Sequence, residues 1–204
     1  MNWFKTEDDP LADDFVKEIR ATVPWLLAAA IVVAGYYGVK NYMASRRAAA
    51  SEALVSAYTA EELEEAVSKF GGSDAAGALK LRLAKKYFDA GRYQEAMDVY
   101  DAISGEKAPD GFADVPAVGK AQCLEAIGSY ADAVQAYDAF AEANPASFLA
   151  LTAKLGAARA TALAGDKAKA LERVAAIRES VKGDPLSEAR VDATEDCVKR
   201  SVAK

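Results

Sequence analysis

LAKKYFDAGRYQEAMDVYDAI, residues 83–103, is followed by two copies of the same pattern: KAQCLEAIGSYADAVQAYDAF at residues 120–140 and GAARATALAGDKAKALERVAAI at residues 156–177. A glycine recurs every 37 residues, with an alanine seven residues before it and another five residues after it. Small alanines let two helices approach closely, and glycine takes up the backbone conformation that reverses the chain between them. The pattern therefore predicts helical hairpins that stack on one another. The repeated positions are Gly91, Gly128 and Gly165; Ala84, Ala121 and Ala158; and Ala96, Ala133 and Ala170.

The repeat resembles the tetratricopeptide repeat, a helix–turn–helix unit with a period of about 34 residues. In the first two copies, tyrosines follow the glycine by two and by nine residues and fill the gap to the next hairpin. The third copy departs from the pattern, with Lys167 and Val174 at these positions. We expect an all-α fold with linker helices over 40–73, three tetratricopeptide-like repeats over 74–185, and a polar capping helix over 186–204, because repeat arrays need a polar outer face at their ends.

Residues 22–39, TVPWLLAAAIVVAGYYGV, carry no charge over 18 positions. As a helix they span about 27 Å, which is enough for the hydrocarbon core of a bilayer. Aromatic residues stand near both ends, as in the aromatic belts of membrane proteins. We predict a transmembrane helix, with these anchor residues: Trp25, Leu26, Leu27, Ile31, Val32, Val33, Tyr36 and Tyr37.

A cleaved signal peptide and a buried core helix are the alternatives. A signal peptide begins with basic residues and ends at a small-residue cleavage site, whereas residues 1–21 form an acidic tail and tyrosines and a lysine follow the apolar run. A core helix of this length shows a polar stripe, and this one has none. These comparisons favour an uncleaved anchor. Three Lys or Arg residues lie close on each side of it, so the charge bias that sets orientation gives a tie.

Two further helix starts are marked in the sequence. Asp9 can cap a helix that Pro10 opens. That helix carries Leu11, Phe15, Ile19 and Val23 on one face, which fits either an amphipathic stretch on the membrane or a solvated continuation of the anchor. Thr59 and Glu62 have the spacing of a capping box for a short helix that ends at residues 71–72.

Composition excludes several classes of function. The net charge is −6 and the chain has no histidine, so the basic footprint of a nucleic-acid-binding protein is absent, as are the commonest general base and metal ligand. No phosphate-binding loop, nucleophile elbow or metal-ligand cluster occurs in the sequence. We expect no enzymatic activity, cofactor, metal or small-molecule substrate. Cys123 and Cys197 are 74 residues apart, which fits two buried thiols or a single disulfide.

In tetratricopeptide hairpins, the first helix of each repeat lines a groove that binds other proteins. Family members that grip a partner's terminal carboxylate carry polar residues at the fifth position, where this chain is aliphatic. An apolar strip beside two cations suits an extended or helical segment with hydrophobic anchors and some acidic character. The other reading is that the array closes on itself, with the aliphatic row as core. The resemblance assigns to the groove Leu81, Lys85, Phe88, Val118, Gln122, Glu125, Leu155 and Arg159.

The whole layout resembles the bacterial ancillary subunit of the SecYEG translocon, which has a short acidic tail, one anchor and an exported tetratricopeptide domain. The resemblance implies a single-pass protein of the bacterial inner membrane, with a cytoplasmic N-terminus and a periplasmic C-terminal domain. It also implies translocon subunits, periplasmic chaperones or exported clients as partners, in addition to the lipid bilayer. Two alternatives stay open: a structural accessory subunit or assembly scaffold of another membrane complex, and an adaptor that faces the cytoplasm.

Overall fold

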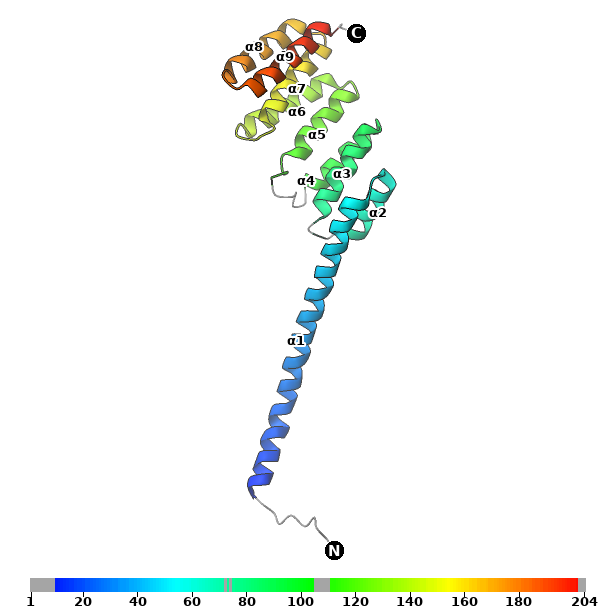
Figure 1. Cartoon of the computed structure of the whole chain (residues 1–204), viewed down its shortest axis with the longest axis vertical. Coiled ribbons are helices and arrows are strands. Elements are labelled where there is room, and N and C mark those ends of the chain that lie inside the picture. The colour runs from blue at the N-terminus through cyan, green and yellow to red at the C-terminus, as the bar shows by residue number, and fades with distance from the viewer. Residues whose placement is uncertain (1–9, 72, 74, 105–110, 202–204) are drawn as a thin grey trace. The chain divides into compact units, whose positions relative to one another are not determined.

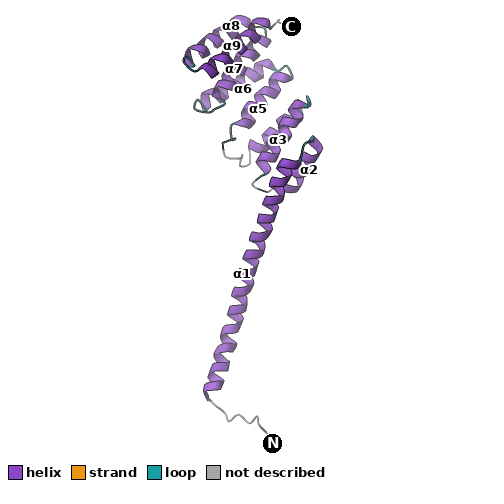
Figure 2. Cartoon of the chain, in the orientation of Figure 1, coloured by secondary structure: helices purple, strands orange, loops and turns teal. Residues whose placement is uncertain are grey.

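The computed structural model describes residues 10–71, 73, 75–104 and 111–201, and over these ranges the protein contains helices and loops without a strand (Figure 2). The predicted all-α fold is confirmed. The chain divides into two units, Met1–Ala49 and Ala50–Lys204. Of the predicted acidic tail over residues 1–21, residues 1–9, with the cap at Asp9, lie outside the described residues, and so do the side chains of residues 10–18.

Helix α1 (Pro10–Ser56) begins at the proline that the sequence marked as its start. The predicted transmembrane stretch lies inside this longer helix, and Pro24 is an interior residue of it. None of the apolar window is buried within the structure, and α1 is the one helix of the described residues that is long and apolar enough to span a membrane. The eight predicted anchor residues are between 52% and 79% exposed. The reading as a core helix is therefore wrong, because no described part of the chain covers this surface.

The second unit is a series of helical hairpins (Figure 1). After α2, the hairpins α3–α4, α5–α6 and α7–α8 follow in chain order, and α9 ends the array. The helices are α2 (Ala60–Phe70), α3 (Ala76–Asp89), α4 (Tyr93–Ser104), α5 (Val115–Ala126), α6 (Tyr130–Ala143), α7 (Ala150–Leu163), α8 (Lys167–Ser180) and α9 (Pro185–Arg200).

The start of α2 is a complete capping box. The Thr59 hydroxyl accepts a hydrogen bond from the Glu62 backbone N–H at 3.1 Å, and the Glu62 carboxylate accepts from the backbone N–H groups of Tyr58 at 2.7 Å and Thr59 at 3.1 Å. These two hydrogen bonds hold the pKa of Glu62 below its usual value, because they favour the charged carboxylate. The prediction made from the spacing of Thr59 and Glu62 is confirmed.

The repeated glycines form the turn of each hairpin. Gly91, Gly128 and Gly165 have φ angles of 76°, 88° and 100°, a left-handed conformation that costs glycine no steric penalty. The residue after each glycine donates its backbone N–H to a carbonyl five residues earlier, which is the bond that closes a Schellman motif. The alanines that flank the three turns in the repeat are 0% to 1% exposed. The 37-residue pattern thus sets both the turn and the close approach of the two helices.

Successive hairpins are joined by a tyrosine that lies against a glycine of the next hairpin. A Cβ placed on Gly119 would lie 2.5 Å from Cζ of Tyr100, and a Cβ on Gly156 would lie 2.6 Å from Cζ of Tyr137. Both tyrosines are buried, and the two pairs are one period of 37 residues apart. The third hairpin has Val174 at the tyrosine position, where it packs in a core cluster with residues of α9.

Helix α9 closes the end of the array. Its buried residues are Val191, Thr194 and Val198, and the helix packs against both α7 and α8. Its Asp184 N-cap accepts from the Leu186 backbone N–H at 3.2 Å. The expected capping helix is present, between Pro185 and Arg200 rather than over 186–204.

Candidate protein-binding groove

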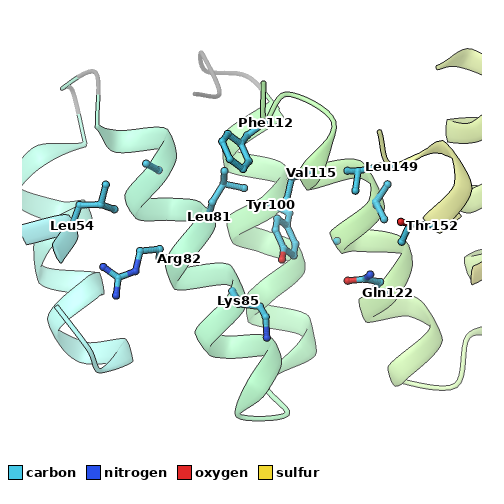
Figure 3. A pocket seen from close by; sticks show the side chains of 13 residues that line it. Leu54, Leu81, Arg82, Lys85, Tyr100, Phe112, Val115, Gln122, Leu149 and Thr152 are labelled. Atoms are coloured by element: carbon cyan, nitrogen blue, oxygen red, sulfur yellow. The ribbon is translucent and has the colours of Figure 1, made fainter. Parts of the chain in front are cut away.

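A groove of about 480 Å³ lies among the first helices of the hairpins in the second unit (Figure 3). Its walls come from α3 and α5, with further residues from the last turn of α1, from α4, from the connections into α5 and α7, and from the first turn of α7. The lining residues are Leu54, Ala78, Leu81, Arg82, Lys85, Tyr100, Phe112, Val115, Val118, Gly119, Gln122, Leu149 and Thr152.

Helix periodicity puts each set of wall residues on one face. Residues three or four positions apart lie on the same side of a helix. This brings Ala78, Leu81 and Lys85 together on α3, and Val115 and Gln122 together on α5. Apolar side chains stand at the N-terminal end of both helices and polar ones follow. The groove thus changes from apolar to polar along the direction of α3 and α5.

Tyr100 of α4 completes the wall where α5 carries Gly119 in place of a side chain. The ring is 5% exposed, and burial is the main cause that raises the pKa of Tyr100 to about 12. Since burial disfavours the charged form, Tyr100 stays a neutral phenol at physiological pH.

Arg82 and Lys85 are the cations of the groove, and both have a partner within the chain. Nη2 of Arg82 donates to the carbonyl oxygen of Ala57 at 2.8 Å, next to the last residue of α1. This bond supplies a donor to the carbonyl end of a helix, where cations are favourable. Nζ of Lys85 forms an exposed ion pair with Asp89 one turn further along α3.

Four of the eight residues predicted for the groove line it: Leu81, Lys85, Val118 and Gln122. Phe88 does not. Its half-buried ring meets the ring of Tyr93 edge to face, with centroids 5.3 Å apart, so it packs within the first hairpin.

Glu125 and Arg159 bind each other. Nε and Nη2 of Arg159 reach the two carboxylate oxygens of Glu125 at 2.5 and 2.7 Å, and the Tyr137 hydroxyl donates to the same carboxylate at 3.1 Å. The carboxylate hydrogen bond raises the pKa of Arg159. A bidentate pair of this kind fixes geometry as well as charge, so these two residues join α5 to α7 instead of facing the groove.

Leu155 was expected in the groove and lies in the core instead. It is 4% exposed and packs in one cluster with Val174, Val191 and Val198. The reason is α9, which covers the face of α7 that corresponds to the Leu81 face of α3. Val118, at the same repeat position on α5, lines the groove but is itself only 3% exposed. The array closes on itself at the third hairpin and leaves a groove at the first two.

Phe112, Leu149 and Leu54 are lining residues that sequence reasoning missed. Phe112 is 51% exposed, and both it and Leu149 stand in the connections between hairpins, outside the aligned windows. One signal was available: Phe112 and Phe148 are large exposed apolar residues 36 positions apart, close to one repeat period. The place of Leu54 in the groove could not be predicted from the repeat, because it depends on the end of α1 packing with the array.

Neither cysteine is in a disulfide; Cys123 is buried and Cys197 is exposed, so the expectation of two buried thiols holds for Cys123 alone. Burial raises the pKa of the Cys123 thiol to about 11, which keeps it protonated and unreactive. Among the described residues, no cluster of three or more His, Cys, Asp or Glu side chains is placed to hold a metal ion.

Comparison of the chain with protein-family models, with curated proteins and with solved structures finds no match.

Proposed function

We propose that the chain is a single-pass membrane protein whose helical array binds segments of other proteins and catalyses no reaction. The observation that carries this proposal is the groove between α3 and α5, where the half-buried Leu81 and the exposed Phe112 are available to a partner. Val118 also lines this groove but is only 3% exposed. Concave sites lined mainly by apolar side chains with a few polar groups are typical binding sites. The exposed apolar surface of α1 supports the membrane part of the proposal, since soluble proteins rarely expose apolar patches of this extent.

Within this class we propose an ancillary subunit of the bacterial SecYEG translocon, with its N-terminus in the cytoplasm and its array in the periplasm. The support is the resemblance in layout: an acidic N-terminal segment, one apolar helix and a hairpin array. In this role the groove contacts periplasmic chaperones or exported proteins. The competing role is a scaffold subunit of another membrane complex, which the closed third hairpin favours because that part of the array offers packing rather than a groove.

Orientation is tested by protease treatment of intact spheroplasts from bacteria that express the chain with an N-terminal epitope. We expect the array to be digested while the epitope survives on a short fragment. Digestion only after lysis would place the array in the cytoplasm and contradict the proposed orientation.

The partner is tested by photo-crosslinking in intact membranes. A benzophenone amino acid at Leu81 is expected to crosslink to protein, whereas the same group at Glu172, an exposed position on α8, serves as the matched control. Purification in mild detergent should then recover translocon subunits and chaperones. Recovery of one stable complex without Sec subunits would reject the translocon role and favour the scaffold.

A further inference from the structure

We infer that the groove selects a protein segment in which an apolar side chain is followed, about 6 Å further along, by an Asp or Glu side chain. This inference rests on the proposed function and adds the chemistry of the partner. It follows from the distribution of apolar and charged residues along the groove.

The groove is polarised along its two walls. Figure 3 shows Leu81, Phe112, Val115 and Leu149 toward one end, and Lys85 and Gln122 toward the other. On α3 the change from Leu81 to Lys85, and on α5 the change from Val118 to Gln122, each take four residues. Four residues of helix rise about 6 Å. A partner with its apolar group at the first level therefore presents its next contact at the level of Lys85 and Gln122.

The charge of the lining is one-sided. Arg82 and Lys85 line the groove, and no Asp or Glu is among the described lining residues, although the whole chain carries a net charge of −6. The guanidinium of Arg82 is held in place by its bond to the Ala57 carbonyl, and its planar fork of donors matches a carboxylate. The local charge thus complements an acidic group, in contrast to the rest of the chain.

Lys85 is the cation that a partner reaches most easily. Its side chain is 64% exposed, and its present partner Asp89 is outside the groove lining. An incoming carboxylate competes with Asp89 for the same ammonium group. Exposed pairs of this kind contribute little individually, so the carboxylate gives selectivity while the apolar groups supply most of the affinity.

The groove favours a side-chain carboxylate over a chain terminus because apolar lining lies on both sides of the cations. Leu54 stands to one side of Arg82, and Val115 and Leu149 stand to the other side (Figure 3). A segment that passes through the groove meets all of them. The required spacing corresponds to residues i and i+4 on a helix, or i and i+2 on an extended strand.

The test uses the full chain in detergent micelles and amidated, fluorescein-labelled peptides of about 16 residues, the length of a helix that crosses a few turns. The first peptide carries Leu and Glu four positions apart on an Ala, Gln and Ser background, and two matched peptides replace Glu by Gln or Lys. Fluorescence anisotropy should show the Glu peptide binding roughly threefold more tightly than the Gln peptide, and more tightly again than the Lys peptide, with a preference that shrinks at high salt.

Reversing the charge of Lys85 tests whether this residue selects the acidic peptide. Lys85→Glu should weaken binding of the Glu peptide by roughly three- to tenfold and strengthen binding of the Lys peptide. The matched control is Lys169→Glu, at an exposed position on α8 outside the groove, which should leave the order of the three peptides unchanged. Far-UV circular dichroism of each variant verifies that it is folded.

Equal binding of the three peptides, or no binding of any, would overturn the inference. The proposed function would still stand if Leu81 crosslinks to protein, because that experiment is independent of the partner's charge. Crosslinked segments that lack an acidic residue at the stated spacing, or crosslinks to lipid alone, would also reject the inferred selectivity.

Discussion

Tyr100 and Tyr137 occupy space that ordinary side chains on the next hairpin would fill. Each ring lies against a glycine of the following first helix, at distances that no Cβ tolerates. At the scale of single residues, the stacking of hairpins depends on these two contacts, because a ring and a bare backbone together bring the helices close.

Gly119→Ala is expected to destabilise the array. By helix propensity alone the substitution stabilises by up to about 1 kcal/mol, but the new methyl group would lie 2.5 to 2.9 Å from three ring atoms of Tyr100. Overpacking of this kind costs about 1–3 kcal/mol, so a net loss should appear in urea denaturation followed by circular dichroism. In a Tyr100→Leu background the same substitution should cost less, and an equal cost in both backgrounds would show that the ring is not the obstacle.

Stability is expected to fall between about pH 10 and pH 12, and part of this fall is due to Tyr100. Its pKa is about 12 in the folded protein against an ordinary value of 10.0, so as the pH rises the unfolded chain releases the phenolic proton first. The contribution of Tyr100 to the free energy of unfolding is complete below pH 10 and is lost as the pH approaches 12, with a size of about 3 kcal/mol. Tyr100→Phe should remove this part of the slope when the free energy of unfolding is compared across that range. An identical slope in the variant would contradict the assignment.

At the scale of whole elements, the groove ends where α9 packs over α7. It covers Leu155, and the pair of Arg159 with Glu125 ties α7 to α5. Among the described helices, none covers the first and second hairpins in this way, and the groove remains between them.

Val191→Asp is expected to detach α9 from the array. Val191 is fully buried, and an unpaired charge placed there carries a desolvation penalty of several kcal/mol. The matched substitution Leu186→Asp, on the same helix at an exposed position, should have little effect. Limited proteolysis should release the C-terminal segment from the first variant and not from the second. Equal resistance of both variants would show that α9 is held by contacts other than this core.

The helices were largely predictable because their boundaries are set by local residues. Pro10, Thr59 with Glu62, and the glycines at intervals of 37 act within a few positions of their own place in the chain. The groove was only half predictable. Leu155 and Arg159 have the same repeat positions as Leu81 and Lys85, and they differ because α9 and Glu125, distant in sequence, pack against them. A repeated sequence pattern does not show at which repeat another helix packs over the array.

At the scale of the whole molecule, α1 gives the chain an exposed apolar surface that its described residues do not bury. A charged residue at the centre of a membrane helix disfavours insertion by about 2.5–3.5 kcal/mol. The double substitution Val32→Lys and Val33→Lys should therefore move the protein from the carbonate-resistant membrane fraction to the soluble fraction. Val55→Lys, at an exposed position beyond the apolar stretch, is the control and should stay with the membrane. Retention of the double variant in the membrane would argue against α1 as the anchor.

Because α9 covers α7, the structure also predicts how many partner segments each copy of the chain binds. The groove between α3 and α5 has room for one segment, so each copy engages one partner segment there at a time. A partner with several matching segments gains avidity only by recruiting several copies. Effective concentration then decides how strongly it is held, and it rises with the number of copies per unit area of membrane. Capture of such partners should therefore increase more steeply than linearly with expression level.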